Sequence, residues 1–528
     1  MDDLPLSTQE LGLPEKFQHW RRSQTACINR CLNQERRYQI HAIPTGGGKS
    51  AAYVGNALIT QDRTLILTST KALQDQLVAD FGSIGIADLR GRQNYKCRMS
   101  RNMSCEEGKH AGCSDSKETS CPHRCAVELA KRSRIVVTNY ACWISNQLFG
   151  ESLGKFDALV LDEAHNAPDE ICGLIGVELT TEEVYQLLNS EFPEREESDE
   201  WRSWAQAMLP RAELEKAGLA QLIARSGDSR VMIVNELRRW NNLCRKLTLV
   251  AGMIGPWCVE PSRKGYKLDP LWPSQYAERS LFAGIPKIYA YSATATPQTM
   301  HIMGVAPDEL EYYQYPSTFP PRRSPVYRIP TCKVDRHMER AGGSLKSLWI
   351  SRIDQILEKR GDRKGIIHCV SYSRKEEILK ASEHRKYLVG HSPEDMATTV
   401  EWYRASKPPL VLVSPSVSTG YDFPGQDCEF QIIAKVPFPD TRSKVMQARE
   451  KSDPLYVPHL TVQTLQQATG RGMRYERDQC ENFIVDDHVA RMLATYRDLF
   501  LDWWLKLYHR RDLIPNPPPP LNGSGGID

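Results

Sequence analysis

Short apolar runs along this chain predict strands that are buried on both faces. They occupy residues 39–43, 158–161, 365–369 and 410–413. Runs of four or five residues without strict polar alternation are typical of parallel sheets that helices cover on each side. The pattern therefore predicts an α/β fold.

Residues 171–280 follow a different pattern, which predicts a mainly helical segment. Ile233, Leu237, Trp240, Cys244 and Leu247 are spaced by 4, 3, 4 and 3 residues. This spacing puts all five side chains on one face of a helix, where packing against a neighbour is the simplest use for them.

A glycine-rich loop, Pro-Thr-Gly-Gly-Gly-Lys-Ser at residues 44–50, follows the first of these strands. Glycines let backbone N–H groups turn toward a phosphate, and a following helix N-terminus adds its dipole. The candidate nucleotide-binding residues are Thr45, Gly46, Gly47, Gly48, Lys49 and Ser50. Lys49 would reach the β- and γ-phosphates of a nucleotide, and Ser50 would hold Mg²⁺. The alternative is an ordinary glycine-rich turn, because Ile43 stands where the strict motif has its first glycine.

The strand at 158–161 ends in two acids, Asp162 and Glu163. Parallel sheets bind ligands at the carboxyl ends of their strands, so these carboxylates are expected at a site. Asp162 would hold Mg²⁺ and Glu163 would polarise an attacking water. The following His165 would link this site to a neighbouring domain. A solvated acidic helix start is the alternative for this motif on its own.

Two arginines near the end of the chain, Arg471 and Arg474, are candidates for binding an anion. Their spacing of three residues predicts that both lie on one helical face and point at one ligand. Cations of this kind stabilise the charge that develops on a transferred phosphoryl group.

In order, these motifs resemble those of a superfamily 2 helicase of the DEAH type. The resemblance extends from about residue 20 to 490 and includes Ser292-Ala293-Thr294, Gly420 and Asp422, and Gln467-x-x-Gly470-Arg471-x-x-Arg474. It implies two RecA-like P-loop NTPase domains that bind ATP and Mg²⁺ in the cleft between them. It assigns catalysis to Asp162, Glu163, Gln467, Arg471 and Arg474, and nucleotide binding to the glycine-rich loop, Gln24 and Asp422.

The spacing of the motifs implies two insertions in the first domain, as in the DinG/XPD branch of these helicases. Ser50 and Asp162 are 112 residues apart, and Glu163 and Ser292 are 129 residues apart. In that branch an iron–sulfur domain and a mainly helical arch domain occupy these places. The resulting segments are 1–90, 135–170 and 281–320 for the first helicase domain, 91–134 for the cluster domain, 171–280 for the arch, 321–510 for the second helicase domain, and 511–528 for a disordered tail.

The overall composition adds nothing to this prediction, but one segment has an unusual charge. The chain of 528 residues has a net charge of +3, which gives no sign of a polyanionic partner. Residues 91–134, however, hold ten lysines and arginines against five acids, a local charge of +5. A patch of this kind suits a nucleic-acid backbone. The sequence contains neither an export signal nor a long apolar run, which predicts a cytoplasmic protein without a membrane span.

Five of the 15 cysteines crowd the same basic segment: Cys97, Cys105, Cys113, Cys121 and Cys125. Four cysteines can hold a [4Fe–4S] cluster or Zn²⁺. Zinc ribbons usually contain close Cys-x-x-Cys pairs, which this segment lacks, so the spacing favours the cluster. We expect the first four as ligands, with Cys125 as the alternate.

The resemblance implies an ATP-dependent helicase that moves 5′→3′ on single-stranded DNA and unwinds forked duplexes, as a monomer. RNA–DNA hybrids stay open as substrates. Two alternatives remain: a translocase that removes proteins or R-loops without processive unwinding, and a non-catalytic DNA-binding module.

Overall fold

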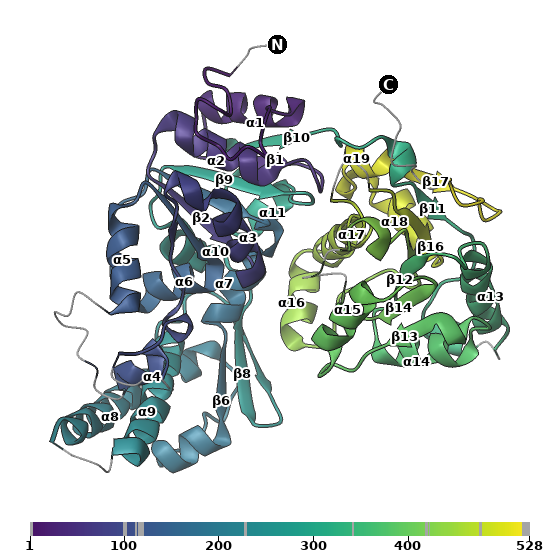
Figure 1. The fold of residues 1–528 in the computed structure, drawn as a ribbon. Coiled ribbons are helices and arrows are strands. Elements are labelled where there is room, and N and C mark those ends of the chain that lie inside the picture. The colour runs from purple at the N-terminus through teal and green to yellow at the C-terminus, as the bar shows by residue number, and fades with distance from the viewer. Residues whose placement is uncertain are drawn as a thin grey trace. The chain divides into compact units, whose positions relative to one another are not determined.

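The computed structural model describes residues 4–98, 103–110, 113, 121–225, 230–340, 343–417, 421, 423–474 and 478–519. The chain divides into two compact units (Figure 1). The first consists of Met1–His41, Ser50–Tyr312 and Asp440–Asp453, and the second of Ala42–Lys49, Tyr313–Pro439 and Pro454–Asp528. Each unit is built on one seven-stranded sheet.

The first sheet has the strand order β10-β1-β9-β5-β2-β4-β3. Its strands are β1 (Tyr38–Ala42), β2 (Thr64–Thr68), β3 (Ala87–Asp88), β4 (Ile135–Asn139), β5 (Ala158–Asp162), β9 (Lys287–Ser292) and β10 (Leu310–Gln314). The pairs β2–β4, β2–β5, β3–β4 and β5–β9 are parallel. Every residue of β1, β2 and β5 is buried, as expected of strands covered on both faces.

Helices connect the strands of this sheet. They are α1 (Arg22–Leu32), α2 (Lys49–Thr60), α3 (Lys71–Phe81), α4 (Cys105–His110), α5 (Pro122–Arg132), α6 (Tyr140–Phe149), α7 (Ala167–Ile175), α10 (Ser274–Ala277) and α11 (Pro297–Ile302). Side-chain caps fix two of them: Thr70 accepts a hydrogen bond from the Leu73 N–H, and Asn139 accepts one from the Cys142 N–H.

The segment predicted as a helical arch contains two long helices, α8 (Ser198–Arg225) and α9 (Arg230–Ala251). The predicted apolar face of α9 is confirmed at four of its five positions, since Leu237, Trp240, Cys244 and Leu247 are buried, whereas Ile233 is half-buried. The segment also contains an antiparallel sheet that the sequence analysis missed, in the order β6-β8-β7. Its strands are β6 (Val177–Thr180), β7 (Trp257–Pro261) and β8 (Gly265–Pro270).

The second sheet has the order β13-β14-β12-β15-β16-β11-β17, and all its strand pairs are parallel. Its strands are β11 (Val326–Arg328), β12 (Lys364–His368), β13 (Leu388–Gly390), β14 (Leu410–Ser414), β15 (Phe430–Ile433), β16 (Glu481–Ile484) and β17 (Tyr508–Arg510). The helices are α12 (Arg336–Arg340), α13 (Ser344–Glu358), α14 (Tyr372–Ala381), α15 (Met396–Ala405), α16 (Lys444–Ser452), α17 (Tyr456–Ala468), α18 (His488–Thr495) and α19 (Asp502–Leu505). The four runs predicted as strands therefore correspond to β1, β5, β12 and β14.

Helix α16 packs with the first unit although its neighbours in sequence belong to the second. Arg449 is 6% exposed and donates hydrogen bonds to the carbonyl oxygens of Leu271 and Pro270, at 2.7 Å and 3.1 Å. These bonds satisfy a buried guanidinium, which would otherwise carry a large desolvation cost.

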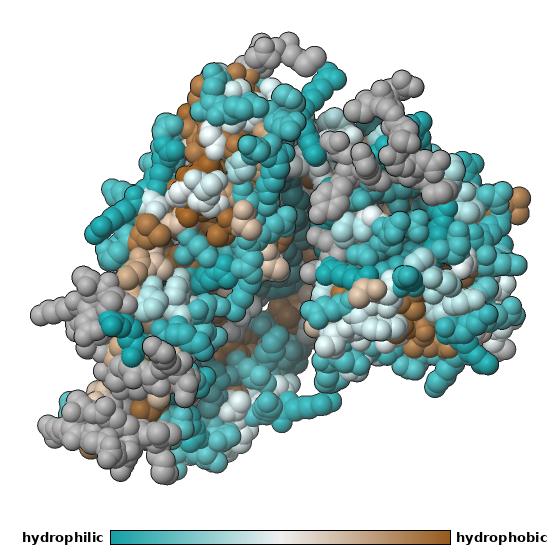
Figure 2. All heavy atoms as spheres, in the orientation of Figure 1, coloured by the Kyte–Doolittle hydropathy of each residue, from teal (hydrophilic) through white to brown (hydrophobic). Residues whose placement is uncertain are grey.

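Hydrophilic residues cover most of the visible face of each unit, and hydrophobic residues appear there in small patches (Figure 2). Within the part of the chain that the structure describes, no helix combines the length and the apolar character that a membrane span requires.

Candidate functional site

The glycine-rich loop joins β1 to α2, as the sequence predicts. Gly46 and Gly48 have φ angles of 75° and 76°, in the left-handed region that glycine adopts most readily. A Cβ at Gly47 would lie 2.5 Å from Ile43 Cγ2, so that position also excludes a side chain. Helix α2 begins at Lys49, so its N-terminus lies directly after the loop. The local geometry is that of an anion-binding loop.

Strand β5 delivers Asp162 and Glu163 to the edge of the first sheet. Asp162 is the last residue of β5 and is 5% exposed, and its carbonyl oxygen accepts a hydrogen bond of 3.0 Å from the Tyr140 hydroxyl. Glu163 has a φ of 48°, which costs a residue with a side chain about 1–3 kcal/mol. Strain of this kind clusters at functional sites, where the surrounding structure maintains it.

His165 connects these acids to the end of β9. Its Nδ1 lies 2.8 Å from Ser292 Oγ and 3.4 Å from Glu163 Oε2. Ser292 Oγ also accepts a hydrogen bond of 3.0 Å from the Thr294 N–H. The sequence predicts that His165 reaches a neighbouring domain, whereas this contact lies within the first unit. The sequence does not indicate Ser292 as the partner, because the two residues are 127 positions apart.

Sheet topology brings the loop, the acids and Ser292 to one edge. Strands β1, β9 and β5 are consecutive neighbours, and Asp162 is paired in register with Tyr291. Burial, and then the negative charge of Asp162, raise the pKa of Tyr53 in α2 well above its usual value. A hydroxyl and a carboxylate at this edge are ligand types that suit Mg²⁺.

Gln24 lies in the first turn of α1 and is 4% exposed. Its Oε1 accepts a hydrogen bond of 2.8 Å from the Arg21 N–H, which satisfies an N–H group at the helix start. This cap gives Gln24 a structural function in addition to the one that the resemblance implies.

The prediction that Arg471 and Arg474 share a helical face is wrong. Helix α17 ends at Ala468, and both arginines lie in the turn that follows. Glycines on both sides of Arg471 favour the end of the helix. A Cβ at Gly472 would also lie 2.4 Å from Cys480 Sγ.

Hydrogen bonds hold this turn in the second unit. The Gly470 N–H donates to the Gln467 carbonyl at 3.1 Å, and Arg471 Nη1 donates to the Tyr421 carbonyl at 3.3 Å. The Arg474 N–H donates to Asp478 Oδ2 at 2.5 Å. The predicted Asp422 lies outside the described residues.

His368 is a buried residue near this turn that sequence analysis did not single out. It ends β12, and its Nε2 lies 2.8 Å from Gln431 Oε1. The Gln431 amide in turn donates to Asn482 Oδ1 at 2.9 Å. Burial, helped by the positive charge of Arg471, lowers the pKa of His368 to about 4, so the imidazole is neutral at pH 7. The network ties three neighbouring strands together beneath Arg471.

The cysteine-rich segment places Cys97 and Cys113 beside Gly108. A Cβ at Gly108 would lie 2.2 Å from Cys97 Sγ and 3.9 Å from Cys113 Cβ. Cys105 begins α4, and the N–H of Cys97 bonds to the Met103 carbonyl at 2.8 Å. These contacts form a small cradle lined by thiols.

Helix α5 supplies the remaining two cysteines. Cys121 is its N-cap, followed by proline as predicted, and Cys125 lies one turn later and is exposed. Tyr95 contacts His123 edge to face, with ring centroids 5.3 Å apart, and so connects the cradle to this helix. Residues 99–102 and 114–120 lie outside the described part of the segment.

Several lysines and arginines of this segment are exposed at its surface. The exposed cations include Lys96, Arg98, Lys109, Arg124, Arg132 and Arg134. Cations distributed in this way can displace counterions from a polyanion.

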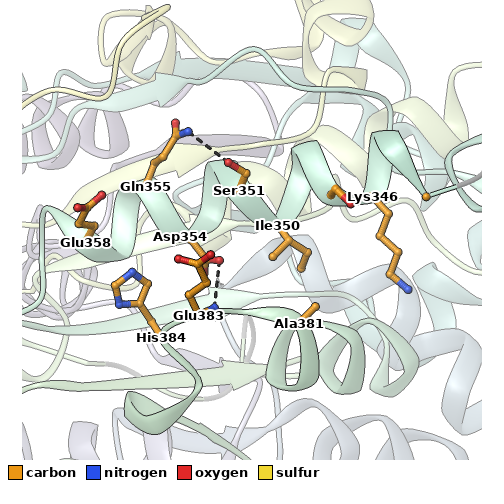
Figure 3. Close-up of a pocket in the computed structure, with 11 residues that line it drawn as sticks. Lys346, Ile350, Ser351, Asp354, Gln355, Glu358, Ala381, Glu383 and His384 are labelled. Carbon is orange, nitrogen blue, oxygen red and sulfur yellow. Dashed lines mark hydrogen bonds between the residues drawn. The ribbon is translucent and has the colours of Figure 1, made fainter.

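A pocket of about 580 Å³ lies elsewhere, in the second unit between α13 and the residues after α14 (Figure 3). Lys346, Ile350 and Asp354 extend along α13 on one side, and Glu383 and His384 lie on the other. Asp354 accepts hydrogen bonds from Ser382 Oγ and the Glu383 N–H, so its carboxylate holds the pocket wall. None of the predicted site residues lines this pocket.

Two family models match the chain. The model of the DEAD/DEAH box helicase matches residues 21–174, and that of the helicase C-terminal domain matches residues 353–506. A comparison with curated proteins gives no match.

Solved structures of XPD helicases are similar over 93% of this chain and the full length of their own chains. An XPD helicase is 14% identical with a TM-score of 0.63, apo XPD is 15% identical with a TM-score of 0.58, and S. tokodaii Xpd4 is 12% identical with a TM-score of 0.56. At these identities the likeness shows the fold alone, which is that of two RecA-like α/β domains.

Proposed function

This chain is a member of helicase superfamily 2, because it contains a DEAD/DEAH box domain and a helicase C-terminal domain, and we propose that it unwinds DNA. It would move 5′→3′ along single-stranded DNA and separate the duplex ahead of it, using ATP hydrolysis. The observation that carries the proposal is the edge of the first sheet, where a phosphate-type loop, Asp162, Glu163 and the His165–Ser292 contact come together.

At this edge each residue has a role that its position supports. Thr45, Gly46, Gly47 and Gly48 would surround the phosphates of ATP, and Lys49 would neutralise the β- and γ-phosphates. Ser50 and Asp162 would hold Mg²⁺, which supplies charge neutralisation during phosphoryl transfer. Glu163 would accept hydrogen bonds from the attacking water and orient it.

Residues of the second unit complete the proposed chemistry. Arg471 and Arg474 would stabilise the charge on the transferred phosphoryl group, with Gln467 beside them. The hydrogen bonds that hold this turn, including the one to Asp478, would keep both guanidinium groups in place. Gln24 would contact the adenine from α1, and Asp422 would contribute to the same nucleotide site.

The His165–Ser292 hydrogen bond would couple hydrolysis to movement. Ser292 ends β9, and His165 contacts both Ser292 and Glu163. A change in the position of Glu163 during hydrolysis would therefore be transmitted through one imidazole ring to another strand of the sheet.

The cysteine-rich segment supplies the donor type that a [4Fe–4S] cluster needs, which supports the proposal that it binds one. Cys97 and Cys113 lie beside Gly108, where a side chain would collide with the Cys97 thiol, and Cys105 begins the helix that contains this glycine. These three with Cys121, or Cys125 as the alternate, would hold the cluster, which braces the surrounding chain. The exposed cations of the same segment would contact forked DNA where its strands separate. The protein would act as a monomer in the cytoplasm, where thiols stay reduced.

Unwinding of tailed duplexes tests the proposal. Purified full-length protein is given 5′-tailed and 3′-tailed duplexes in DNA–DNA and RNA–DNA versions, with ATP and Mg²⁺. We expect strand separation of 5′-tailed DNA, dependent on ATP, and none with Lys49→Ala. Preference for a 3′ tail would contradict the direction, and protein displacement without strand separation would indicate a translocase instead.

A further inference from the structure

A second group of sulfur and nitrogen ligands lies in the first unit, away from the cysteine-rich segment. Cys27 and Cys31 are one turn apart on α1, and His41 lies on the adjoining strand β1. One ligand atom from each of the three lies within 4.8 Å of the others. Cys27 and His41 are 0% exposed and Cys31 is 3% exposed. Neither the proposed hydrolysis nor the proposed DNA contacts use these residues.

Tyr291 adds a fourth polar atom to the group. It lies on β9, is 0% exposed, and its hydroxyl oxygen is 3.5 Å from Cys27 Sγ and 3.4 Å from Cys31 Sγ. Cys31 Sγ is also 3.3 Å from His41 Nε2. Two thiols, an imidazole and a phenol oxygen therefore face one another from three separate elements.

These separations match the edges of a tetrahedral zinc site. Zinc bonds of about 2.0 Å to nitrogen and about 2.3 Å to sulfur place neighbouring ligand atoms roughly 3.5–3.8 Å apart. The observed separations of 3.3–3.5 Å differ from these edges by only a few tenths of an ångström. The ligand atoms of Cys27, Cys31 and His41 all lie within 4.8 Å of one another, so small side-chain rotations would bring them to the ion.

The charge balance favours the same ion. Two thiolates neutralise one Zn²⁺, so the occupied site carries no net charge and suits a fully buried position. His41 Nε2 is also 3.1 Å from Gln39 Oε1, and coordination through Nε2 would replace that contact. Cys₂His with an oxygen is a donor set that zinc accepts readily.

We infer that Cys27, Cys31 and His41 form a structural zinc site, with Tyr291 next to the fourth position. The ion would join α1, which carries Gln24 one turn before Cys27, to β1, which leads directly into the glycine-rich loop. It would also join both to β9, which ends at Ser292. Zinc would thus fix the elements that carry three parts of the nucleotide site.

Metal analysis of full-length protein, purified without oxygen from zinc-containing medium, tests this inference. We expect about one zinc per chain in the wild type, and less than about a tenth in Cys27→Ser/Cys31→Ser, because structural zinc is retained only with its ligands. The matched control is Cys428→Ser/Cys480→Ser. This pair is also buried, with sulfur atoms 3.9 Å apart, but the metal-ligand group does not include it. Zinc should be unchanged in this control and in Cys97→Ser, which separates the site from the cysteine-rich segment.

Cobalt substitution keeps the inference testable if the double variant fails to fold. Wild-type protein loaded with Co²⁺ should show a thiolate-to-cobalt charge-transfer band and the visible bands of tetrahedral cobalt. Cys31→Ser alone should reduce the charge-transfer intensity by about half, because one of two thiolates is lost. Protein without bound zinc, zinc that persists in the folded double variant, or a Cys27–Cys31 disulfide would each overturn the inference.

Discussion

The edge of the first sheet and the cysteine-rich segment are built in opposite ways. At the sheet edge, buried strands set the positions of Asp162 and Ser292, and hydrogen bonds join residues that are distant in sequence. In the cysteine-rich segment, the cysteines lie on short helices and turns and range from buried Cys97 to exposed Cys125. The first region can supply fixed geometry for chemistry, whereas the second would depend on the proposed cluster to complete its core. Changes to the two regions should therefore have separable effects.

The largest effect is expected for Lys49→Ala. Loss of the cation at the phosphate loop should reduce ATP hydrolysis about a hundredfold or more, since oriented charges supply most phosphoryl-transfer catalysis. Binding of single-stranded DNA, measured by fluorescence anisotropy, should remain largely intact. The exposed Lys407→Ala serves as control and should hydrolyse ATP normally. Unreduced turnover by Lys49→Ala would contradict the assignment of the loop.

The next largest effect is expected for Cys97→Ser, which acts on the other region. Iron content, about four atoms per chain in brown wild-type protein if one [4Fe–4S] cluster is present, should fall. Unwinding should fall at least about tenfold, because the loss of a metal ligand disrupts the segment that meets the fork. ATP hydrolysis should mostly remain.

Cys258→Ser, at a half-buried position on β7, is the control for this change. Equal loss of unwinding and hydrolysis in Cys97→Ser would indicate general misfolding and remove the contrast between the regions. Wild-type protein without iron would contradict the cluster, whether or not the Cys27–Cys31–His41 site holds zinc.

Ser292→Ala tests whether the His165–Ser292 contact couples ATP hydrolysis at the sheet edge to the unwinding in which the cysteine-rich segment is proposed to take part. Removing the partner of His165 should reduce unwinding per ATP hydrolysed by about fivefold, about 1 kcal/mol, the value of one net hydrogen bond. Ser280→Ala removes another buried hydroxyl, which bonds to the Tyr276 carbonyl at 2.7 Å, and should affect stability without affecting this ratio. A ratio equal to that of the wild type would exclude His165–Ser292 from coupling.

The smallest effect is expected for Gln24→Glu. The glutamate retains an oxygen that can cap the Arg21 N–H, but it loses the amide donor that would contact adenine. Preference for ATP over GTP, measured as the ratio of kcat/KM values, should fall about threefold, since one hydrogen bond is lost. Thermal stability should stay close to that of the wild type, and an unchanged ratio would leave Gln24 with its capping role alone.

Much of the chemistry was predictable because it is local in sequence. A few consecutive residues are enough to recognise the glycine-rich loop, the strand that ends at Asp162 and the proline after Cys121. The prediction for Arg471 and Arg474 failed because spacing alone does not show that α17 ends before them. The antiparallel sheet of β6, β7 and β8 was missed because the two long helices separate β6 from the β7–β8 hairpin in the sequence.

The sequence alone determined the fold class, the order of the motifs and the residue types at the nucleotide site. These follow from strand burial and from backbone geometry that only glycine tolerates, both of which act over a few residues. The tertiary structure decided which distant side chains meet: His165 with Ser292, His368 with Gln431, and Cys27 and Cys31 with His41 and Tyr291. The physical reason is that sheet order, in which β9 lies between β1 and β5, is set by packing of the whole unit and leaves no mark in local spacing.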